Sequence, residues 1–338
     1  MINVGSDFSG VGAFEEALKR IGFPFKIQFS CDMDKFARET YLKNNLSEHY
    51  FPDNVYNREI PKQSLDIYMT SPPCQAFSSV GKNMGESDER GILFYNSYEF
   101  IKKNKPKSFV FENVQGLLSD DNGLTFNKWC YYLGGESVNG NTNLFKDDVQ
   151  LDYHIYYRIL NSKYFDIPQN RKRIFVVGIR KDIIHNFQFP EGVKTKKRLK
   201  DILKKDVEHK YFLSQKTLDM FLKKNEKHTW EGKGFLFFPK NENQIANTIT
   251  TKAGGRATDN FILTKKEPIN KQEGYLYAKY EGYFVRKLTP RECFRLMGFS
   301  DEFIINKSDS QAFKQAGNSI VVNVLEAILK KIIPIITE

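Results

Sequence analysis

The sequence contains little cysteine, and none of it is arranged to hold a metal ion. Its four cysteines, Cys31, Cys74, Cys130 and Cys293, are scattered along 338 residues, without a C-x-x-C pair and without a histidine at a metal-ligand spacing. This distribution argues against a zinc site and against the disulfide framework of small secreted domains. We therefore expect no bound metal.

Long apolar segments are also missing. No uninterrupted apolar run approaches the roughly 18 residues that a membrane-spanning helix needs. The amino terminus lacks a charged head followed by an apolar signal segment. We expect no membrane association and a reducing, cytoplasmic setting.

Positive charge, in contrast, is in excess. Lysine and arginine number 51 against 41 aspartate and glutamate residues, giving a net charge of +10 and a pI near 9.1. A basic surface favours polyanionic partners, because each cation set against a phosphate releases condensed counterions. On its own this balance is weak evidence for nucleic-acid binding. The length and the hydrophobic share of 40% predict a globular chain of two domains.

Short apolar runs separated by amphipathic stretches dominate the first half of the chain. We expect strands at residues 2–4, 26–30, 66–70, 108–111, 153–157 and 173–178. Helical periodicity lies between several of them, over residues 13–21, 35–44 and 95–103. This alternation is typical of a doubly wound α/β fold with a parallel sheet.

The composition of the sequence changes at about residue 191. From there the chain is rich in lysine and asparagine, and its hydrophobic periodicity is less regular. We expect residues 1–190 to form the large domain, 191–285 a separate recognition domain, and 286–304 a hinge through which the chain returns. Residues 305–338 regain an apolar helical pattern, which predicts a C-terminal helix that completes the large domain. Residues 134–148, rich in Gly, Asn and Asp, are expected to form an exposed loop.

A glycine turn follows the first expected strand. Gly10 and Gly12 would let the backbone approach a ligand at the carboxyl edge of the sheet, where open α/β folds bind cofactors. One strand later, Asp32 could bind a ribose diol. A structural turn with a solvated acid would look similar, so both interpretations stay open. The turn lacks the third glycine of the dinucleotide fingerprint, which argues against a nicotinamide-dependent dehydrogenase.

Cys74 lies just past the expected strand 66–70, in Thr70-Ser-Pro-Pro-Cys-Gln-Ala-Phe-Ser-Ser79. Most cysteines are buried and inert. Two prolines stiffen the backbone in front of this one, and the polar residues around it make a poor place to bury a thiol. We therefore interpret Cys74 as an exposed, reactive cysteine on the cofactor side of the sheet.

Two further segments place charge at the ends of apolar strands. Glu112 and Asn113 end one strand, where a buried charge needs a partner or a task, although Asn is also a common helix cap. Arg171 and Arg173 precede another strand and fall on one face of an extended segment, where they could hold a phosphate or a base oxygen. A solvated charge run is the alternative interpretation of the arginines.

The C-terminal part contains a helix-start signal and a candidate ligand contact. Thr289, Pro290 and Glu292 form the pattern of a capping box with proline at the first helical position. Gly317-Asn318-Ser319 is expected to open another helix and to contact a ligand through Asn318 or through free N–H groups.

Taken together and in this order, these segments resemble the cytosine-C5 DNA methyltransferase family, best known from bacterial restriction-modification systems. The resemblance covers nearly the whole chain, with residues 191–285 the least similar. It depends on four motifs: Pro73-Cys74-Gln75, Glu112-Asn113-Val114, Gln169-x-Arg171-x-Arg173 and Gly317-Asn318-Ser319. It implies a Rossmann-like S-adenosylmethionine-dependent methyltransferase domain with a smaller, mainly irregular or β target-recognition domain.

The resemblance also implies a mechanism. Cys74 would add to C6 of a cytosine, Glu112 would hydrogen-bond N3 and the exocyclic amine, and C5 would take the methyl group. Arg173 would contact the base, and Arg171 would help to position the base or a phosphate. The target atom is inaccessible in a stacked duplex, so the base must rotate out. Residues 78–91, with three glycines, are similar in character to the family's closing loop.

The ligand contacts implied by the resemblance fall into two sets. The site for S-adenosyl-L-methionine, and for its product S-adenosyl-L-homocysteine, would comprise Phe8, Gly10, Gly12, Asp32, Met33 and Asn318. Double-stranded DNA would be contacted by Gln75, Ser78, Thr248 and Arg256. The chain departs from the family where Ser6 holds a position that is often acidic and Asp7 follows it, and in the longer stretch between Asn113 and Gln169.

Partners and alternatives follow from the same resemblance. Such enzymes are commonly monomers in the bacterial cytoplasm or nucleoid, beside a cognate restriction endonuclease that acts independently. One alternative is a tRNA cytosine-C5 methyltransferase, but that branch usually carries a Cys-Phe-Thr element, which this chain lacks. Another is a non-catalytic DNA-binding relative, against which the retention of Cys74, Glu112 and both arginines argues.

Overall fold

The computed structural model describes residues 1–52, 54–55, 58–72, 89–134, 137–138, 141–142, 149–230 and 236–338. The chain forms two compact units. The first comprises Met1–Asn161, Lys172–Glu191 and Val324–Glu338, and the second comprises Ser162–Arg171 and Gly192–Asn323. Within the described ranges, no helix combines the length and the apolar character that crossing a membrane requires.

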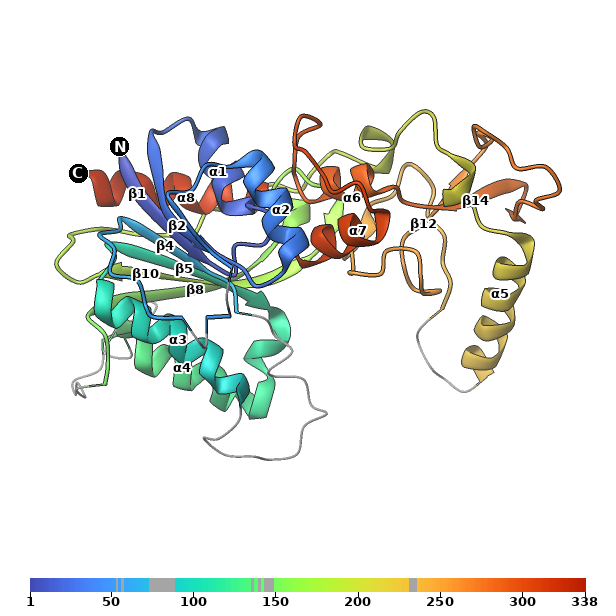
Figure 1. Ribbon diagram of the computed structural model, residues 1–338. Coiled ribbons are helices and arrows are strands. Elements are labelled where there is room, and N and C mark those ends of the chain that lie inside the picture. Colours follow the sequence, from blue (N-terminus) through green and yellow to red (C-terminus); the bar gives the residue numbers. More distant parts are fainter. Residues whose placement is uncertain are drawn as a thin grey trace. The chain divides into compact units, whose positions relative to one another are not determined.

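A mixed sheet lies at the centre of the first unit (Figure 1). In the described part of the chain its order is β3-β2-β1-β4-β5-β10-β8-β6-β7. The strands are β1 (Ile2–Asp7), β2 (Phe25–Cys31), β3 (His49–Phe51), β4 (Ile67–Thr70), β5 (Ser108–Val114), β6 (Ser137–Val138), β7 (Asn141–Thr142), β8 (Tyr153–Asn161) and β10 (Lys172–Arg180). From β3 to β5 all neighbouring strands are parallel, whereas β10 is antiparallel to β5 and to β8. The carboxyl ends of β1, β2, β4 and β5 therefore meet at one edge, where such sheets bind ligands.

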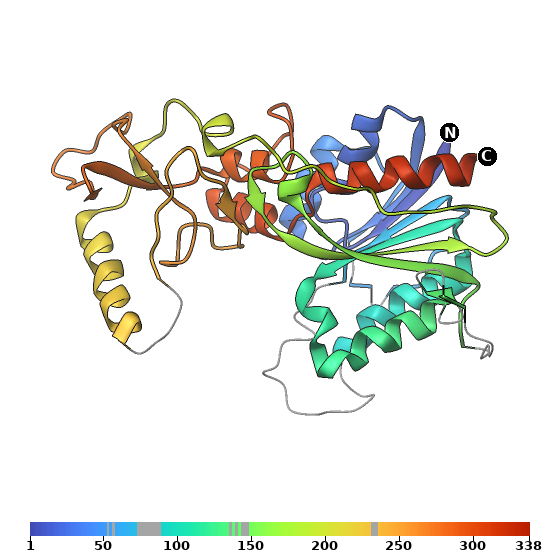
Figure 2. The same ribbon diagram turned by 180° about the vertical axis from the view of Figure 1, so that it is seen from behind.

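Helices cover both faces of this sheet (Figures 1 and 2). One face carries α1 (Ala13–Ile21), α2 (Lys35–Asn44) and the C-terminal helix α8 (Val322–Thr337), and the other carries α3 (Glu89–Asn104) and α4 (Leu124–Gly134). Two short 3-10 helices, η2 (Gln115–Leu118) and η3 (Asp120–Gly123), follow β5. Asp34 caps α2, because its carboxylate accepts hydrogen bonds from the backbone N–H groups of Phe36 and Ala37.

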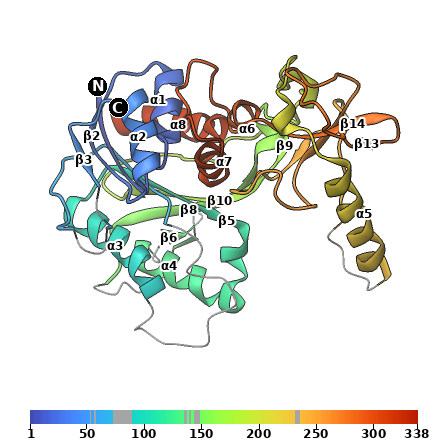
Figure 3. The ribbon, with the colours of Figure 1, turned by 45° about the vertical axis from the view of Figure 1, so that its right-hand side comes forward.

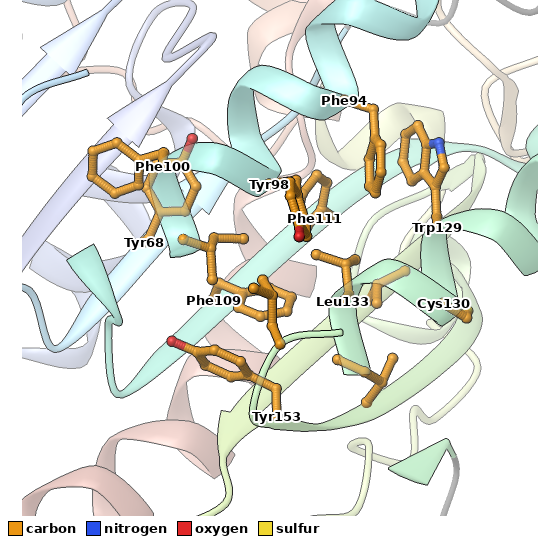
Figure 4. Packing of buried hydrophobic residues seen from close by; sticks show 14 of the residues in the cluster. Tyr68, Phe94, Tyr98, Phe100, Phe109, Phe111, Trp129, Cys130, Leu133 and Tyr153 are labelled. Atoms are coloured by element: carbon orange, nitrogen blue, oxygen red, sulfur yellow. The ribbon is translucent and has the colours of Figure 1, made fainter. Parts of the chain in front are cut away.

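An aromatic core fills the space between the sheet and the helices α3 and α4 (Figure 4). Phe94 stacks on Trp129 with ring centroids 4.3 Å apart, and Tyr68 stacks on Phe100 at 4.2 Å. The first six residues of β5 are all buried, as expected of a central strand that is covered on both faces. This packing fixes β5, whose carboxyl end reaches the candidate site.

Within its described residues, the second unit contains two small sheets and several helices, which Figure 3 shows. Its strands are β9 (Gln169–Asn170), β11 (Ala246–Asn247), β12 (Phe261–Thr264), β13 (Lys279–Tyr280) and β14 (Tyr283–Lys287). Its helices are η4 (Ser162–Tyr164), η5 (Leu199–Asp201), η6 (His209–Tyr211), α5 (Gln215–Trp230), α6 (Pro290–Leu296) and α7 (Asp309–Asn318). Strands β12, β14 and β13 form an antiparallel sheet, and β9 pairs in parallel with β11. A separate core that includes Leu218, Phe221 and Phe261 joins α5 to this sheet.

The predicted α/β class with a parallel-dominated sheet is confirmed, and the helices expected at residues 13–21 and 35–44 have those bounds. The antiparallel placement of β8 and β10 was not predicted. It arises because the chain passes from β8 to β10 through the short segment Ser162–Arg171, which contains no crossover helix of the kind that parallel neighbours need.

The compact units and the expected domains divide the chain at different residues. The first unit ends at Glu191 before the recognition region, but Ser162–Arg171 and residues 286–323 belong to the second unit. The reason is packing: α6 and α7 contact each other, and the Val322 N–H donates to the Met297 carbonyl at 2.9 Å. The apolar C-terminal segment is therefore two helices, α7 and α8. The recognition region also contains the helix α5, which the irregular sequence pattern did not predict.

Candidate active site

The turn after β1 has an unusual backbone. Phe8, Gly10 and Gly12 all have positive φ values, of 55°, 55° and 94°. Such a conformation is an outlier for a bulky residue like Phe8 and marks a backbone held for a reason. A side chain at position 12 would collide with α2, because its Cβ would lie 2.4 Å from Nδ2 of Asn45. The predicted glycine turn is therefore present, packed against the helix that follows β2.

Asp32, directly after β2, anchors this turn. Its Oδ2 accepts a hydrogen bond from the Gly10 N–H at 2.9 Å, and its Oδ1 accepts one from the Asp34 N–H at 2.8 Å. The neighbouring side chain, Met33, is 68% exposed. A half-buried carboxylate beside an exposed thioether and a bare glycine backbone suits a ligand with a sugar diol and an apolar ring. The predicted cofactor residues of the first unit, Phe8, Gly10, Gly12, Asp32 and Met33, therefore lie directly after β1 and β2, and a hydrogen bond joins the two segments.

A buried carboxylate, that of Glu15, lies next to β1, the strand that leads into the glycine turn. Glu15 of α1 accepts hydrogen bonds through Oε1 from the Ser6 hydroxyl at 3.0 Å and the Tyr41 hydroxyl at 2.9 Å. Burial raises the pKa of Glu15 above its ordinary value. The sequence departs from the family at Ser6, and the structure shows that α1 supplies an acid at this place from elsewhere in the chain. Sequence reasoning missed Glu15. The signal that could have found it is an acidic residue three positions after Gly12, in the first turn of the helix that follows the glycine turn.

Asp7, the other departure, faces the opposite side of the sheet from Ser6, since the two are neighbours on one strand. It forms a buried ion pair with Arg58, and its Oδ2 accepts a hydrogen bond from the Tyr68 hydroxyl at 2.7 Å. The Arg58 guanidinium also lies over the Phe51 ring, 5.3 Å from its centroid. Asp7 therefore joins β1, β4 and the segment after β3 from inside the protein.

Glu112 lies near the carboxyl end of β5 and is 7% exposed. Its Oε2 accepts a hydrogen bond from the Ser71 hydroxyl at 2.9 Å, and its Oε1 is 3.1 Å from Nε of Arg173. The antiparallel pairing of β5 with β10 brings Arg173 there. The structure thus places two predicted site residues in direct contact and adds Ser71, which sequence reasoning did not single out.

Asn113 holds the chain on the way to Cys74. Its side-chain amide donates to the Pro72 carbonyl at 3.1 Å. With the bond from Ser71 to Glu112, this fixes both residues that follow β4 to the end of β5. Cys74 itself, together with Gln75, Ser78 and most of the expected closing loop 78–91, lies outside the described residues.

The three other cysteines are buried. Burial raises the pKa of the Cys31 and Cys130 thiols to about 12 and that of Cys293 well above its ordinary value. A protonated, enclosed thiol is a poor nucleophile at neutral pH. None of these three is therefore suited to covalent catalysis.

The remaining predicted residues belong to the second unit. Asn318 is exposed and ends α7 instead of opening a helix; α8 begins four residues later, at Val322. The Thr248 hydroxyl donates to the Asn170 carbonyl at 2.8 Å, and the Arg256 side chain is exposed on a loop after β11.

Arg171 and Arg173, which were predicted to act together, have different surroundings. It is 3% exposed, and its guanidinium donates to the backbone carbonyls of Ile249, Gly317 and Ser319 at 2.8–3.0 Å. Arg171 and Arg173 belong to different compact units. Strand β9 ends at Asn170 and β10 begins at Lys172, so Arg171 lies between the two strands, whereas Arg173 lies within β10.

In the ranges that the structure describes, no three His, Cys, Asp or Glu side chains gather in a way that could hold a metal ion.

Comparison with known proteins assigns the chain to a family. A family model described as C-5 cytosine-specific DNA methylase matches residues 2–334. The chain belongs to this family. Among its curated relatives, the type II methyltransferase M.SsoII of Shigella sonnei is 37% identical, with 96% of this chain and 78% of that protein covered. The type II methyltransferase M.HhaI of Haemophilus parahaemolyticus is 35% identical, with 95% and 91% covered.

Solved structures show the same fold as this methylase. The crystal structure of Schizosaccharomyces pombe Dnmt2 methyltransferase superposes with a TM-score of 0.72 at 19% identity and covers 99% of both chains. A putative DNA modification methyltransferase from an Escherichia coli prophage gives 0.66 at 20% identity over the full length of both. As a C-5 cytosine-specific DNA methylase, the chain is a DNA (cytosine-5)-methyltransferase, and S-adenosylmethionine is the methyl donor of this family.

Proposed function

We propose that this methyltransferase modifies a cytosine turned out of duplex DNA within a specific sequence, with Cys74 as its covalent nucleophile. The observation that carries the proposal is the cluster at the end of β5. Glu112 contacts Ser71 and Arg173, and Asn113 holds Pro72, two residues before Cys74. A hydrogen-bonding carboxylate and a fixed backbone in front of a thiol are what attack on a pyrimidine ring requires.

Glu112 would recognise and activate the base. Its carboxylate is oriented from two sides, by the Ser71 hydroxyl at 2.9 Å and by Nε of Arg173 at 3.1 Å. Held in this way, it would hydrogen-bond N3 and the exocyclic amine of cytosine, and Arg173 would contact the same base. Preorganised polar groups of this kind stabilise charge that develops on the ring without having to reorient during the reaction.

In the proposed reaction, Cys74 forms a covalent bond to the cytosine ring and is released from it again. The Cys74 thiolate forms a bond to C6, and the electron pair of the C5–C6 double bond becomes available at C5. When bound, S-adenosylmethionine supplies an electrophilic methyl group, which ends on C5, and S-adenosyl-L-homocysteine is the leaving group. Transfer of the C5 proton to solvent water restores the double bond and expels the Cys74 thiolate, which is then ready for another turnover.

The cofactor contacts in the first unit would come from the glycine turn and the end of β2. Asp32 would bind the ribose diol, Met33 would cover the adenine, and the backbone at Gly10 and Gly12 would approach the methionine part. Phe8, in its left-handed conformation, would set the direction in which the turn leaves β1. Asn318 is assigned to the same cofactor by the resemblance of Gly317-Asn318-Ser319.

Recognition of DNA would combine several segments. Thr248 and Arg256 of the second unit would contact the duplex, and Gln75 and Ser78 would act beside the extruded base. Because its relatives are named type II methyltransferases, we propose that the chain is the modification enzyme of a restriction-modification system. It would act as a monomer in the bacterial cytoplasm or nucleoid, independently of a cognate endonuclease.

Mapping of methylated bases tests the proposal. The purified protein is incubated with plasmid DNA and S-adenosylmethionine, and 5-methylcytosine is located by bisulfite sequencing, with a reaction lacking the methyl donor as control. We expect conversion-resistant cytosines at one short recurring sequence. Absence of methylation, or methylation on adenine, would refute the proposed function.

A further inference from the structure

Arg171 bridges two segments of the second unit that are far apart in the sequence. One guanidinium nitrogen, Nη1, donates to the Ile249 carbonyl at 3.0 Å. The other, Nη2, donates to the carbonyls of Gly317 at 3.0 Å and Ser319 at 2.8 Å. The first carbonyl precedes the loop that carries Arg256, and the other two flank Asn318. One buried cation therefore contacts the backbone on both sides of the predicted cofactor residue and at the root of the predicted DNA-contacting loop.

Gln169 also forms a hydrogen bond with the backbone of Ile249, to which Arg171 donates. Its Oε1 accepts a hydrogen bond from the Ile249 N–H at 2.9 Å, and its Nε2 donates to the Leu296 carbonyl at 2.8 Å. Together with the bond from Arg171, this engages both the N–H and the carbonyl of Ile249, which is itself buried. Ile249 is therefore held by two side chains and has little freedom to move independently of them.

The loop after Ile249 is closed by hydrogen bonds to a single buried side chain. We call residues 250–259 the recognition loop. The Asp259 carboxylate closes it by accepting hydrogen bonds from the Gly254 N–H at 3.0 Å, the Arg256 N–H at 2.8 Å and the Thr250 hydroxyl at 3.2 Å. Because these bonds tie the Arg256 backbone to the buried Asp259 side chain, we expect a displacement of exposed Arg256 to reach Ile249.

Direct packing reinforces the link between the recognition loop and the end of α7. A Cβ at Gly317 would lie 2.4 Å from the Thr251 nitrogen and 2.5 Å from the Thr250 carbonyl carbon. Only glycine permits this approach of the two backbones. The Gly317–Ser319 backbone thus contacts the recognition loop through van der Waals packing as well as through Arg171.

Burial makes the bridge energetically demanding. A guanidinium removed from water needs acceptors, and its solvation here depends on carbonyls from both segments. If either segment shifts while the other stays, the cation loses hydrogen bonds that water does not replace. The arrangement therefore favours joint movement of the recognition loop and the Gly317–Ser319 backbone.

We propose that Arg171 is a positioning residue that couples DNA binding to cofactor binding, by linking the recognition loop to the backbone around Asn318. The inference rests on the proposed function, in which the loop contacts DNA and Asn318 contacts S-adenosylmethionine. Coupling is reciprocal: DNA bound at the loop strengthens cofactor binding, and bound cofactor strengthens DNA binding by the same factor.

A binding experiment with Arg171→Lys tests the proposal. Lysine keeps the positive charge but cannot reach both segments with a planar fork. The dissociation constant of S-adenosylhomocysteine, which cannot react, is measured by calorimetry with and without a duplex carrying the mapped target sequence. In the wild type we expect the duplex to tighten binding about 5- to 150-fold. In Arg171→Lys this factor should fall toward one, with binding in the absence of DNA much less affected.

Arg198→Lys is the matched control. The Arg198 guanidinium also donates to backbone carbonyls in the second unit, but they belong to its own segment, at Thr195, Lys196 and Lys197. This variant should keep the wild-type factor. Gly317→Ala tests the same junction with Arg171 intact, because its new Cβ displaces the recognition loop, and it should also lower the factor.

The outcomes separate the two proposals. A wild type that binds both ligands without mutual enhancement, or an Arg171→Lys protein that keeps the full factor, overturns the coupling role and leaves the methylation mapping untouched. If Arg171→Lys does not fold, a wild-type factor in Gly317→Ala has the same consequence. A wild type that binds neither S-adenosylhomocysteine nor DNA overturns the proposed function itself.

Discussion

At the scale of single residues, the chemistry depends on carboxylates that the fold holds in defined surroundings. Glu112 is buried at the end of β5, yet its two oxygens are engaged by groups from different segments, the Ser71 hydroxyl and the Arg173 guanidinium. Glu15 is equally enclosed but contacts only hydroxyl groups among its described side-chain partners, those of Ser6 and Tyr41. The first arrangement suits a group that acts on a substrate, and the second suits a group that supports the cofactor turn.

Replacing Glu112 by Gln should lower the methyl-transfer rate by about 10²- to 10⁴-fold, the usual contribution of a positioned acid–base group. Glutamine has nearly the same volume as glutamate but no charge. Its N–H₂ group would face either the Ser71 hydroxyl or the Arg173 guanidinium, both of which are donors. Single-turnover transfer of a labelled methyl group measures the effect, with DNA affinity followed separately. Glu99→Gln, at an exposed position on α3, is the control and should transfer at the wild-type rate. A Glu112→Gln enzyme within threefold of wild type would contradict the role.

Replacing Glu15 by Gln should change how stability depends on pH. Burial raises the pKa of Glu15 in the folded protein above 4.5, its ordinary value. As the pH rises past about 4.5, the unfolded chain releases the proton first, so the stability that Glu15 contributes is lost progressively until the folded carboxyl also ionises. The Gln variant has no proton to lose. It should therefore gain stability relative to wild type as the pH rises from about 4.5 toward neutrality.

Denaturant midpoints of the two proteins, measured across this range, check the prediction. Other titrating groups are common to both and cancel in the difference. A difference that is independent of pH, or one that favours the wild type increasingly at high pH, would show that Glu15 ionises freely inside the protein.

At the scale of elements, local signals determined which helices could be predicted. The helix at residues 35–44 was predicted from its periodicity, and in the structure the Asp34 side chain caps it within the same short segment. The capping box at Thr289 was likewise found as expected, with Glu292 completing it. Such signals need no knowledge of the rest of the chain.

Pairings between distant segments could not be predicted in this way. The contact of Glu112 with Arg173 follows from the antiparallel register of β5 and β10, which no local pattern encodes. The positions of these two residues were predicted through the resemblance. The hydrogen-bond partners of Arg171 were not predicted. Arg171 lies between two strands, and the carbonyls to which it donates lie far along the chain. Glu15 was missed for a similar reason, since only tertiary packing brings it to Ser6.

The cap of α6 gives a prediction at this scale. The Thr289 hydroxyl accepts a hydrogen bond from the Glu292 N–H, and the Glu292 carboxylate accepts one from the Thr289 N–H at 2.7 Å. Thr289→Ala should lower the free energy of unfolding by about 1 kcal/mol. Ser308 occupies the corresponding position of α7 without a side-chain cap bond, so Ser308→Ala should have little effect. Equal losses in the two variants, measured by chemical denaturation, would contradict the role assigned to the capping box.

At the scale of the whole molecule, family membership and the geometry of the first unit support the same chemistry. The family model spans residues 2–334, and in the first unit Glu112 and Asn113 of β5 form hydrogen bonds with Ser71 and Pro72, which follow β4. The other three thiols are buried with raised pKa values. We therefore propose that Cys74 is the cysteine that forms the bond with the substrate.

Trapping that bond is the most direct measurement. The protein is incubated with S-adenosylmethionine and a duplex containing 5-fluorocytosine at the mapped target position, where fluorine takes the place of the proton that must leave C5. We predict a protein–DNA complex that survives denaturing electrophoresis, is absent with Cys74→Ser, and is retained with Cys130→Ser. No stable complex with the wild type, or an undiminished one with Cys74→Ser, would contradict the account.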